Sequence, residues 1–238
     1  MKKTLNLRWI TLILALLSLL ILPCALAEDV EAVEEEEEVV ELTAPVYTYA
    51  FEAPVEYVAG DTSTMTPVPI LGIYKTFTIS TWLNMDELLN GWSGIYTTDG
   101  WGDGAVHIDV RPPAYKFNIE VANVVMRYTS KFNFREHTDE WVHIALTYDK
   151  AAGNCRFYVN GKLDNIASYC NPDTPTNAQF SMAHLGGFLE PDGVTLARAF
   201  DGHLYRFQIF DRVLTKDEIA AESSLVPPAV GEEVAVAE

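Results

Sequence analysis

The stretch Gly91–Gly104 carries the residues of this chain best suited to binding chemistry. It places three aromatic rings and two carboxylates among five glycines, namely Trp92, Tyr96, Trp101, Asp99 and Asp103. An aromatic face can stack on a sugar ring, a carboxylate can accept hydrogen bonds from its hydroxyls, and glycine lets the backbone approach closely. The sequence therefore predicts a ligand site here. The alternative is structural: Ile95 and Tyr96 form a short strand, and the rest is a turn over the domain edge.

Metal ligands and catalytic groups are less well marked. Calcium could use Asp99, Asp103 and nearby carbonyl oxygens, but no cofactor is required by any motif. Glu52, Glu56 and Asp61 could also supply oxygen ligands, although their spacing resembles no calcium loop and favours surface carboxylates. The metal ligands therefore stay unknown.

The sequence lacks the common catalytic motifs. The chain has no Glu-x-Asp-x-Glu run, no Gly-x-Ser-x-Gly elbow, and no His-Glu-x-x-His or Cys-x-x-Cys spacing. His107, His143 and His203 fall in or beside expected strands, where hydrogen-bonded structural histidines are the favoured interpretation. We therefore predict that the protein is not an enzyme.

The net charge of the chain argues against one class of partner. The 238 residues include 34 acidic and 16 basic side chains, for a formal net charge of -18. Nucleic acid is excluded as a partner, because binding it relies on Lys and Arg to neutralise phosphates.

Residues 1–27 have the pattern of a secretory signal peptide. A basic start is followed by the apolar stretch 9–22 and by Ala25-Leu26-Ala27, which suits a signal peptidase. We predict a secreted, periplasmic or cell-surface protein. The alternative is an uncleaved anchor, which would be the chain's single contact with a membrane.

Composition divides the mature chain. Residues 28–41 hold nine acidic side chains and no basic one, which predicts a disordered spacer. Residues 42–225 form the predicted domain, and residues 226–238, with Pro227 and Pro228, are expected to be a disordered tail.

Two cysteines, Cys155 and Cys170, would remain after cleavage, and an oxidising compartment favours a disulfide between them. A two-residue turn at Asn160-Gly161 would place Cys155 opposite Ile166. Four further extended residues span about 13 Å, so the chain must curl back before Cys170 for the bridge to close.

Strand signals fill the predicted domain. Phe77, Ile79 and Thr81 alternate with Thr78, Ser80 and Trp82, and similar alternation recurs near residues 106–110, 115–121, 124–129, 141–148, 155–159, 163–169 and 204–210. A helix is indicated after Thr215, which can form a capping box with Glu218. The prediction is an all-β, antiparallel β-sandwich with one short C-terminal helix.

The order of five segments resembles the LamG-like jelly-roll domains of the concanavalin A-like lectin/glucanase superfamily. The segments are FTISTWL (77–83), EWVHIALTYD (140–149), CRFYVNGKL (155–163), HLGG (184–187) and FDGHLYRFQIFDRVLTKDEI (200–219). The resemblance covers about residues 47–222 and implies two facing antiparallel sheets with adjacent first and last strands. It also implies acidic residues after Gly202, where this chain has Leu204, Tyr205 and Arg206, so a metal site beside Asp201 is not expected.

Large rings in the strands are expected to fill the interior. Trp82 and Trp141 each stand in an alternating strand, and we predict that both are buried between the sheets, with Tyr148, Phe157 and Tyr158 in the core or on a sheet face. The sandwich by itself identifies no ligand, since the same architecture hosts many functions. The best-supported function is a non-catalytic module that binds a glycan or an extracellular protein. The alternatives are a glycoside hydrolase or lyase, and a structural envelope protein held by its N-terminal anchor.

Overall fold

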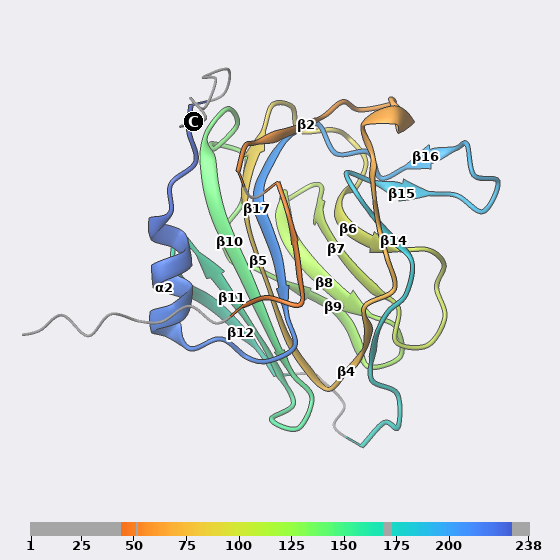
Figure 1. Cartoon of the computed structure of the whole chain (residues 1–238), viewed down its shortest axis with the longest axis vertical. Helices are drawn as coiled ribbons and strands as arrows, with labels where there is room; N and C mark the ends of the chain where they lie inside the picture. Colours follow the sequence, from red (N-terminus) through yellow and green to blue (C-terminus); the bar gives the residue numbers. More distant parts are fainter. Residues whose placement is uncertain (1–43, 51, 169–172, 230–238) are drawn as a thin grey trace, which may run out of the picture. The chain divides into compact units, whose positions relative to one another are not determined.

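Two antiparallel β-sheets face each other across one hydrophobic core (Figure 1). The structure is a computed structural model that describes residues 44–50, 52–168 and 173–229. The predicted signal peptide, acidic spacer and last tail residues lie outside these ranges, as does Cys170. Within the described ranges, no helix is both long enough and apolar enough to cross a bilayer.

The larger sheet has seven strands in the order β1-β17-β5-β10-β11-β12, with β2 also paired to β17. Its strands are β1 (Tyr47–Tyr49), β2 (Val55–Tyr57), β5 (Thr76–Met85), β10 (Trp141–Asp149), β11 (Asn154–Val159), β12 (Lys162–Ala167) and β17 (Gly202–Phe210). The first strand lies beside the last, with Tyr47 opposite Ile209, as the resemblance implied.

The smaller sheet has six strands in the order β3-β14-β6-β7-β8-β9. These are β3 (Thr66–Val68), β6 (Ser93–Thr98), β7 (Val106–Arg111), β8 (Lys116–Val121), β9 (Val125–Thr129) and β14 (Ala183–Leu185). Two short two-stranded sheets complete the fold: β4 (Gly72–Tyr74) with β13 (Ala178–Phe180), and β15 (Phe188–Leu189) with β16 (Leu196–Ala197).

The helix α2 (Lys216–Ser224) packs on the outer face of the larger sheet (Figure 1). Ile219 and Leu214 join Ala145, Tyr158 and Phe210 in a small apolar cluster there. The predicted capping box is present: the Thr215 hydroxyl accepts a hydrogen bond from the Glu218 amide, and the Glu218 carboxylate accepts one from the Thr215 amide. The predicted β-sandwich jelly roll with a short C-terminal helix is confirmed.

Trp82 and Trp141 do not lie between the sheets, so that prediction is wrong. The face of β5 that meets the other sheet carries Phe77, Ile79, Leu83 and Met85, and Trp82 points the opposite way. Trp82 is still buried on this outer face, where it packs edge-on against His143. Trp141 lies on the same outer face, because it pairs with Asn84. Both faces of β5 are buried, and alternation alone cannot tell which one is internal.

The hairpin at Asn160-Gly161 has the predicted turn, with positive φ at both residues and Val159 opposite Lys162. A bulge then shifts the register beyond Tyr158, so that Cys155 faces Ala167 and not Ile166. Cys155 is buried, and the disulfide to Cys170 stays a prediction.

Candidate functional site

The outer face of the smaller sheet carries charged and aromatic side chains on neighbouring strands. Along β7, Val106, Ile108 and Val110 enter the core, so His107, Asp109 and Arg111 point away from it. In the paired strand β8, Glu120 lies on the same outer face, opposite His107. A strand with apolar residues on one face and charged residues on the other therefore builds the floor of the site.

Asp109 is the buried anchor of this site. Its side chain has no exposed surface, and Arg111 binds it through two hydrogen bonds, from Nε at 2.5 Å and from Nη2 at 2.9 Å. The same Nη2 also lies 3.2 Å from Oε2 of Glu120. This two-point geometry fixes the plane of the Arg111 guanidinium group.

Arg198 comes to the site from the segment that follows β16. Its backbone has φ of 52°, in the left-handed region that residues other than glycine rarely adopt. The Gly94 amide donates to the Arg198 carbonyl at 2.7 Å, and a Cβ at Gly94 would come within 3.2 Å of that oxygen. Gly94 thus permits the close approach of the two backbone segments that places Arg198 at the site.

The Arg198 side chain has unused hydrogen-bonding capacity. Its Nη1 lies 3.8 Å from Oδ2 of Asp109, beyond hydrogen-bonding distance, and has no hydrogen-bond partner among the described residues. Burial of the guanidinium lowers the pKa of Arg198, while Asp109 opposes that shift. An unpaired buried donor is costly, so this nitrogen is suited to an acceptor from outside the chain.

Three aromatic rings surround Arg198. Its guanidinium carbon lies 4.5 Å from the Trp92 ring centre, 4.2 Å from Trp101 and 5.4 Å from Phe188. The guanidinium carbon of Arg111 also lies over the Trp92 ring, 3.8 Å from its centre. These cation–π contacts hold both guanidinium groups in place before any ligand arrives.

Trp101 has an exposed ring, 45% accessible, that stacks on His107 at 3.9 Å between ring centres. Burial, together with the charge of Arg198, lowers the pKa of His107 to about 4. His107 is therefore neutral at pH 7, and its Nε2 lies 3.1 Å from the Gly100 carbonyl oxygen. A neutral ring supports Trp101 without adding a third positive charge.

Two open cavities lie next to these groups. One of about 500 Å³ is lined by Trp92, Arg111, Pro112, Ala114, Lys116, Asn118 and Thr129. Another of about 400 Å³ is lined by Asp99, Gly100, Leu189, Glu190, Pro191 and Gly193, at the β15–β16 hairpin. Either volume has room for a monosaccharide unit, and in the first cavity that unit would lie beside the Trp92 ring.

The structure separates the five residues predicted as ligand-binding. Trp92 and Trp101 meet at Arg198, and Asp99 binds Nδ1 of His184 at 2.9 Å. Asp103 accepts a hydrogen bond from Asn123. Tyr96 lies in the core, where its ring stacks on Phe207, so we leave it out of the candidate site.

A bulge explains the position of Tyr96. The register of β6 against β7 shifts between Gly94 and Tyr96, so Tyr96 faces Ile108 on the core side. In a regular strand without the bulge, Tyr96 would share the outer face with Gly94. No sequence pattern near Tyr96 marked the bulge.

Other acidic residues named from the sequence have structural partners. Asp201 Oδ1 accepts a hydrogen bond from the Ala59 amide at 2.8 Å, and Asp61 caps a short 3₁₀ helix, η2 (Thr62–Thr64). The site residues that sequence reasoning missed are Asp109, Arg111, Glu120 and Arg198. The alternation His107-x-Asp109-x-Arg111 in an otherwise apolar strand could have indicated two of them.

Comparison with known proteins agrees with this architecture. Residues 59–220 match the family described as the concanavalin A-like lectin/glucanases superfamily. No curated protein matches the chain in sequence.

Solved structures share the fold at low identity. The chain is 20% identical to the CBM40 of the Ruminococcus gnavus IT-sialidase bound to α2,3-sialyllactose, covering 76% of this chain and 100% of that one, with a TM-score of 0.55. It is 11% identical to a heptameric SAP-like pentraxin from Limulus polyphemus, covering 74% and 83%, with a TM-score of 0.56.

A third solved structure is the ligand-binding domain of botulinum neurotoxin serotype D in complex with N-acetylneuraminic acid. It is 15% identical, with 72% of this chain and 41% of that chain covered and a TM-score of 0.53. The family match spans most of the chain, and the sheet order places its first and last strands side by side. The chain belongs to the concanavalin A-like lectin/glucanases superfamily.

Proposed function

We propose that this protein is a non-catalytic glycan-binding module, and that its ligand is a sugar carrying a carboxylate, of the sialic acid class. The observation that carries the proposal is the pair Arg111 and Arg198, held between aromatic rings around Asp109 on the outer face of the smaller sheet.

The chemistry of the two arginines favours an anionic ligand. Guanidinium groups bind carboxylates through charge-assisted, often bidentate hydrogen bonds. Asp109 and Glu120 already accept hydrogen bonds from Arg111, whereas Nη1 of Arg198 lies 3.8 Å from Asp109 and donates no hydrogen bond within the described residues. Arg198 is therefore the residue best placed to receive a ligand carboxylate.

The exposed ring of Trp101 supplies the apolar part of recognition. It stands beside Arg198, so a sugar whose carboxylate meets Arg198 could place its ring or an acyl substituent on the indole. Two of the similar structures are described with sialyllactose and with N-acetylneuraminic acid, which are ligands of this chemical class. That similarity supports the proposal at the level of the fold.

Isothermal titration with 3′-sialyllactose and with lactose tests the proposal, since the two sugars differ by the acidic residue. We expect sialyllactose to bind and lactose to bind at least tenfold more weakly. Arg198→Gln should weaken sialyllactose binding tenfold or more, while Arg156→Gln, in β11 of the other sheet, should leave it unchanged. Equal binding of both sugars, or wild-type binding by Arg198→Gln, would contradict the proposal.

The alternative of a glycoside hydrolase or lyase has one observation in its favour. Asp109 and Glu120 both approach Arg111, so two carboxylates meet on the outer face of the sheet. Burial raises the pKa of Asp109, a shift that Arg111 opposes, but the Asp109 side chain has no exposed surface and so does not reach a substrate. Release of free sugar from sialyllactose during a long incubation would support the hydrolase and overturn the binding module.

The location of the protein is part of the same proposal. A secreted, periplasmic or cell-surface module would meet extracellular glycans or proteins. The mass of the N-terminal peptide from purified protein decides between cleavage after Ala27 and an uncleaved anchor.

A further inference from the structure

Four neighbouring strands of the larger sheet place a row of polar side chains on its outer face. Glu56 of β2 faces His203 of β17, His203 faces Asn84 of β5, and Asn84 faces Trp141 of β10. Directly opposed side chains have Cβ atoms about 4.5–5.5 Å apart, so this register brings them together. Asp86 follows the end of β5, two residues after Asn84.

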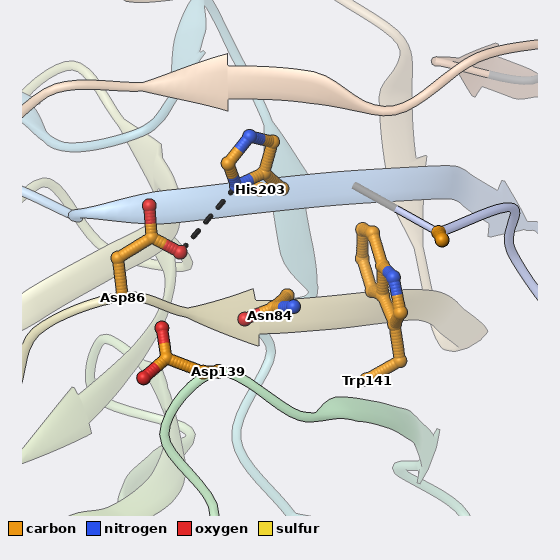
Figure 2. Close-up of a pocket in the computed structure, with 6 residues that line it drawn as sticks. Asn84, Asp86, Asp139, Trp141 and His203 are labelled. Carbon is orange, nitrogen blue, oxygen red and sulfur yellow. Dashed lines mark ion pairs between the residues drawn. The ribbon is translucent and has the colours of Figure 1, made fainter. Parts of the chain in front are cut away.

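Three of these side chains have the chemistry of metal ligands. One ligand atom each from Glu56, Asp86 and His203 lies within 4.8 Å of the other two. Nδ1 of His203 is 3.5 Å from Oδ1 of Asp86, too far for a good hydrogen bond. Asp86 and His203 border a cavity of about 400 Å³, which is also lined by Asn84, Asp139, Trp141 and Ala229 (Figure 2).

Asn84 supplies an independent indication of a ligand. Its side chain is only 5% exposed, and its Oδ1 atom is buried without a hydrogen-bond partner among the described residues. Figure 2 shows this amide oxygen on the side of Asp86 and Asp139, and the same residue lines the cavity. A buried carbonyl oxygen without a donor is costly, and a cation at this position would satisfy it.

We propose that Glu56, Asp86, His203 and Asn84 form a binding site for a divalent transition-metal ion of the zinc class. Imidazole nitrogen with carboxylate oxygen is a typical zinc ligand set, whereas calcium takes six to eight oxygen ligands. Zinc binds such atoms at about 2.0–2.2 Å, which would place them about 3.3–3.5 Å apart. Glu56 and Asp86 are exposed, so their carboxylates can close the remaining distance.

Asp139 adds negative charge to the same cavity. Its amide donates to the Met85 carbonyl at 2.9 Å, and its φ of 59° is in the left-handed region. This contact fixes the loop before β10 against the end of β5. Asp139 therefore lines the same cavity as Asp86 and His203, where its negative charge would favour a cation.

The site is separate from the proposed glycan site. It lies on the outer face of the seven-stranded sheet, whereas Arg111 and Arg198 lie beside Asp109 on the outer face of the six-stranded sheet. A metal here would link the edge strand β2 to β17 and β5, and its presence does not depend on the proposed function.

The test is titration of EDTA-treated full-length protein with ZnCl₂, with CaCl₂ as a second probe. We expect one saturable zinc site per chain, with calcium at least tenfold weaker. His203→Gln and Asp86→Asn should each weaken zinc binding tenfold or more, and the exposed Asp86 can change without unfolding the domain. The matched control is His137→Gln, which removes another surface histidine–carboxylate pair, His137 with Glu140 at 2.9 Å.

Thermal unfolding gives a second measurement. Zinc should raise the melting temperature of the wild type and of His137→Gln, but not of His203→Gln, because a ligand stabilises only the state that binds it. Absence of a saturable zinc site, wild-type affinity in His203→Gln, or equal affinity for calcium would each overturn the proposal. Weak zinc uptake that persists in both histidine variants would place the binding in the acidic stretch 28–41 and count against this site.

Discussion

The guanidinium carbon of Arg198 lies 4.2 Å from the ring centre of Trp101 and 4.5 Å from that of Trp92. A positive group held between rings is oriented before a ligand arrives, so binding costs less side-chain entropy. Trp101 reaches this position because Gly100, with φ of 89°, turns the chain outward after β6.

Trp101→Ala should weaken sialyllactose binding by about 2 kcal/mol, or about thirtyfold, because the mutation removes both the platform and one wall around Arg198. Its melting temperature should stay close to that of the wild type, since the ring is 45% exposed. Titration calorimetry and thermal melts measure the two quantities. If the variant melts early while its folded fraction binds normally, Trp101 is scaffold and the ligand binds elsewhere.

Trp82→Ala should destabilise the fold by about 3–5 kcal/mol, because the ring is 7% exposed and packs against His143. Trp141→Ala should cost less, since Trp141, the first residue of β10, is only partly buried. Urea denaturation of both variants measures the difference. A larger loss for Trp141→Ala than for Trp82→Ala would contradict this prediction.

His143 should make stability depend on pH in the acid range. Burial, reinforced by the charge of Arg206, lowers its pKa to about 3, whereas the unfolded chain has a value of about 6.5. Between these values the unfolded state binds more protons, so the free energy of unfolding falls as pH decreases from 6.5. His107, with a pKa of about 4, adds to the same slope.

Denaturant melts at pH 7.5, 6.5 and 5.5 test this effect. The fall in stability should be smaller in His143→Asn than in the wild type, because one buried neutral histidine is gone. An unchanged slope in the variant would assign the pH dependence to other groups.

Thr215→Ala should lower the free energy of unfolding by about 1 kcal/mol, because it removes the side-chain half of the capping box of α2. Glu218 has a second role there: its hydrogen bond with Arg212 is the main cause that lowers its pKa to about 2. Its contribution is therefore present above pH 4.5 and is lost as pH falls towards 2.

Chemical denaturation of Thr215→Ala and Thr215→Ser at pH 7 separates the cap from other effects. The serine variant keeps a hydroxyl and should be close to the wild type. Equal losses in the two variants would show that the threonine methyl group, and not the cap, matters.

The predicted disulfide between Cys155 and Cys170 should stabilise the protein by about 3 kcal/mol in the chain-entropy model, because it closes a loop of about 15 residues. The observed register favours it more than the expected one, since Cys155 faces Ala167 and the chain has one residue less to bridge. Thiol counting in denatured, non-reduced protein from an oxidising compartment measures it. Two free thiols per chain would refute the bridge.

The sequence by itself determined the local elements. Alternation of apolar and polar residues located β5, β7 and β10, Asn160-Gly161 specified its hairpin turn, and Thr215 with Glu218 specified the start of α2. These features depend on interactions within a few residues, so their signals lie side by side in the chain.

The tertiary structure decided which face is internal and which residues meet. Trp82 lies on the outside of its sheet because Phe77 and Ile79 fill the inside, and a bulge turns Tyr96 inward. A period of two shows which side chains share a face, but it does not identify the buried face when both are covered.

Both proposed sites depend on strands that are distant in sequence. Arg198 reaches Asp109 because the chain after β16 hydrogen-bonds to Gly94, and His203 meets Glu56 and Asn84 because β17 lies between β2 and β5. Such contacts follow from strand order and register, which are set by packing of the whole core and not by any local pattern.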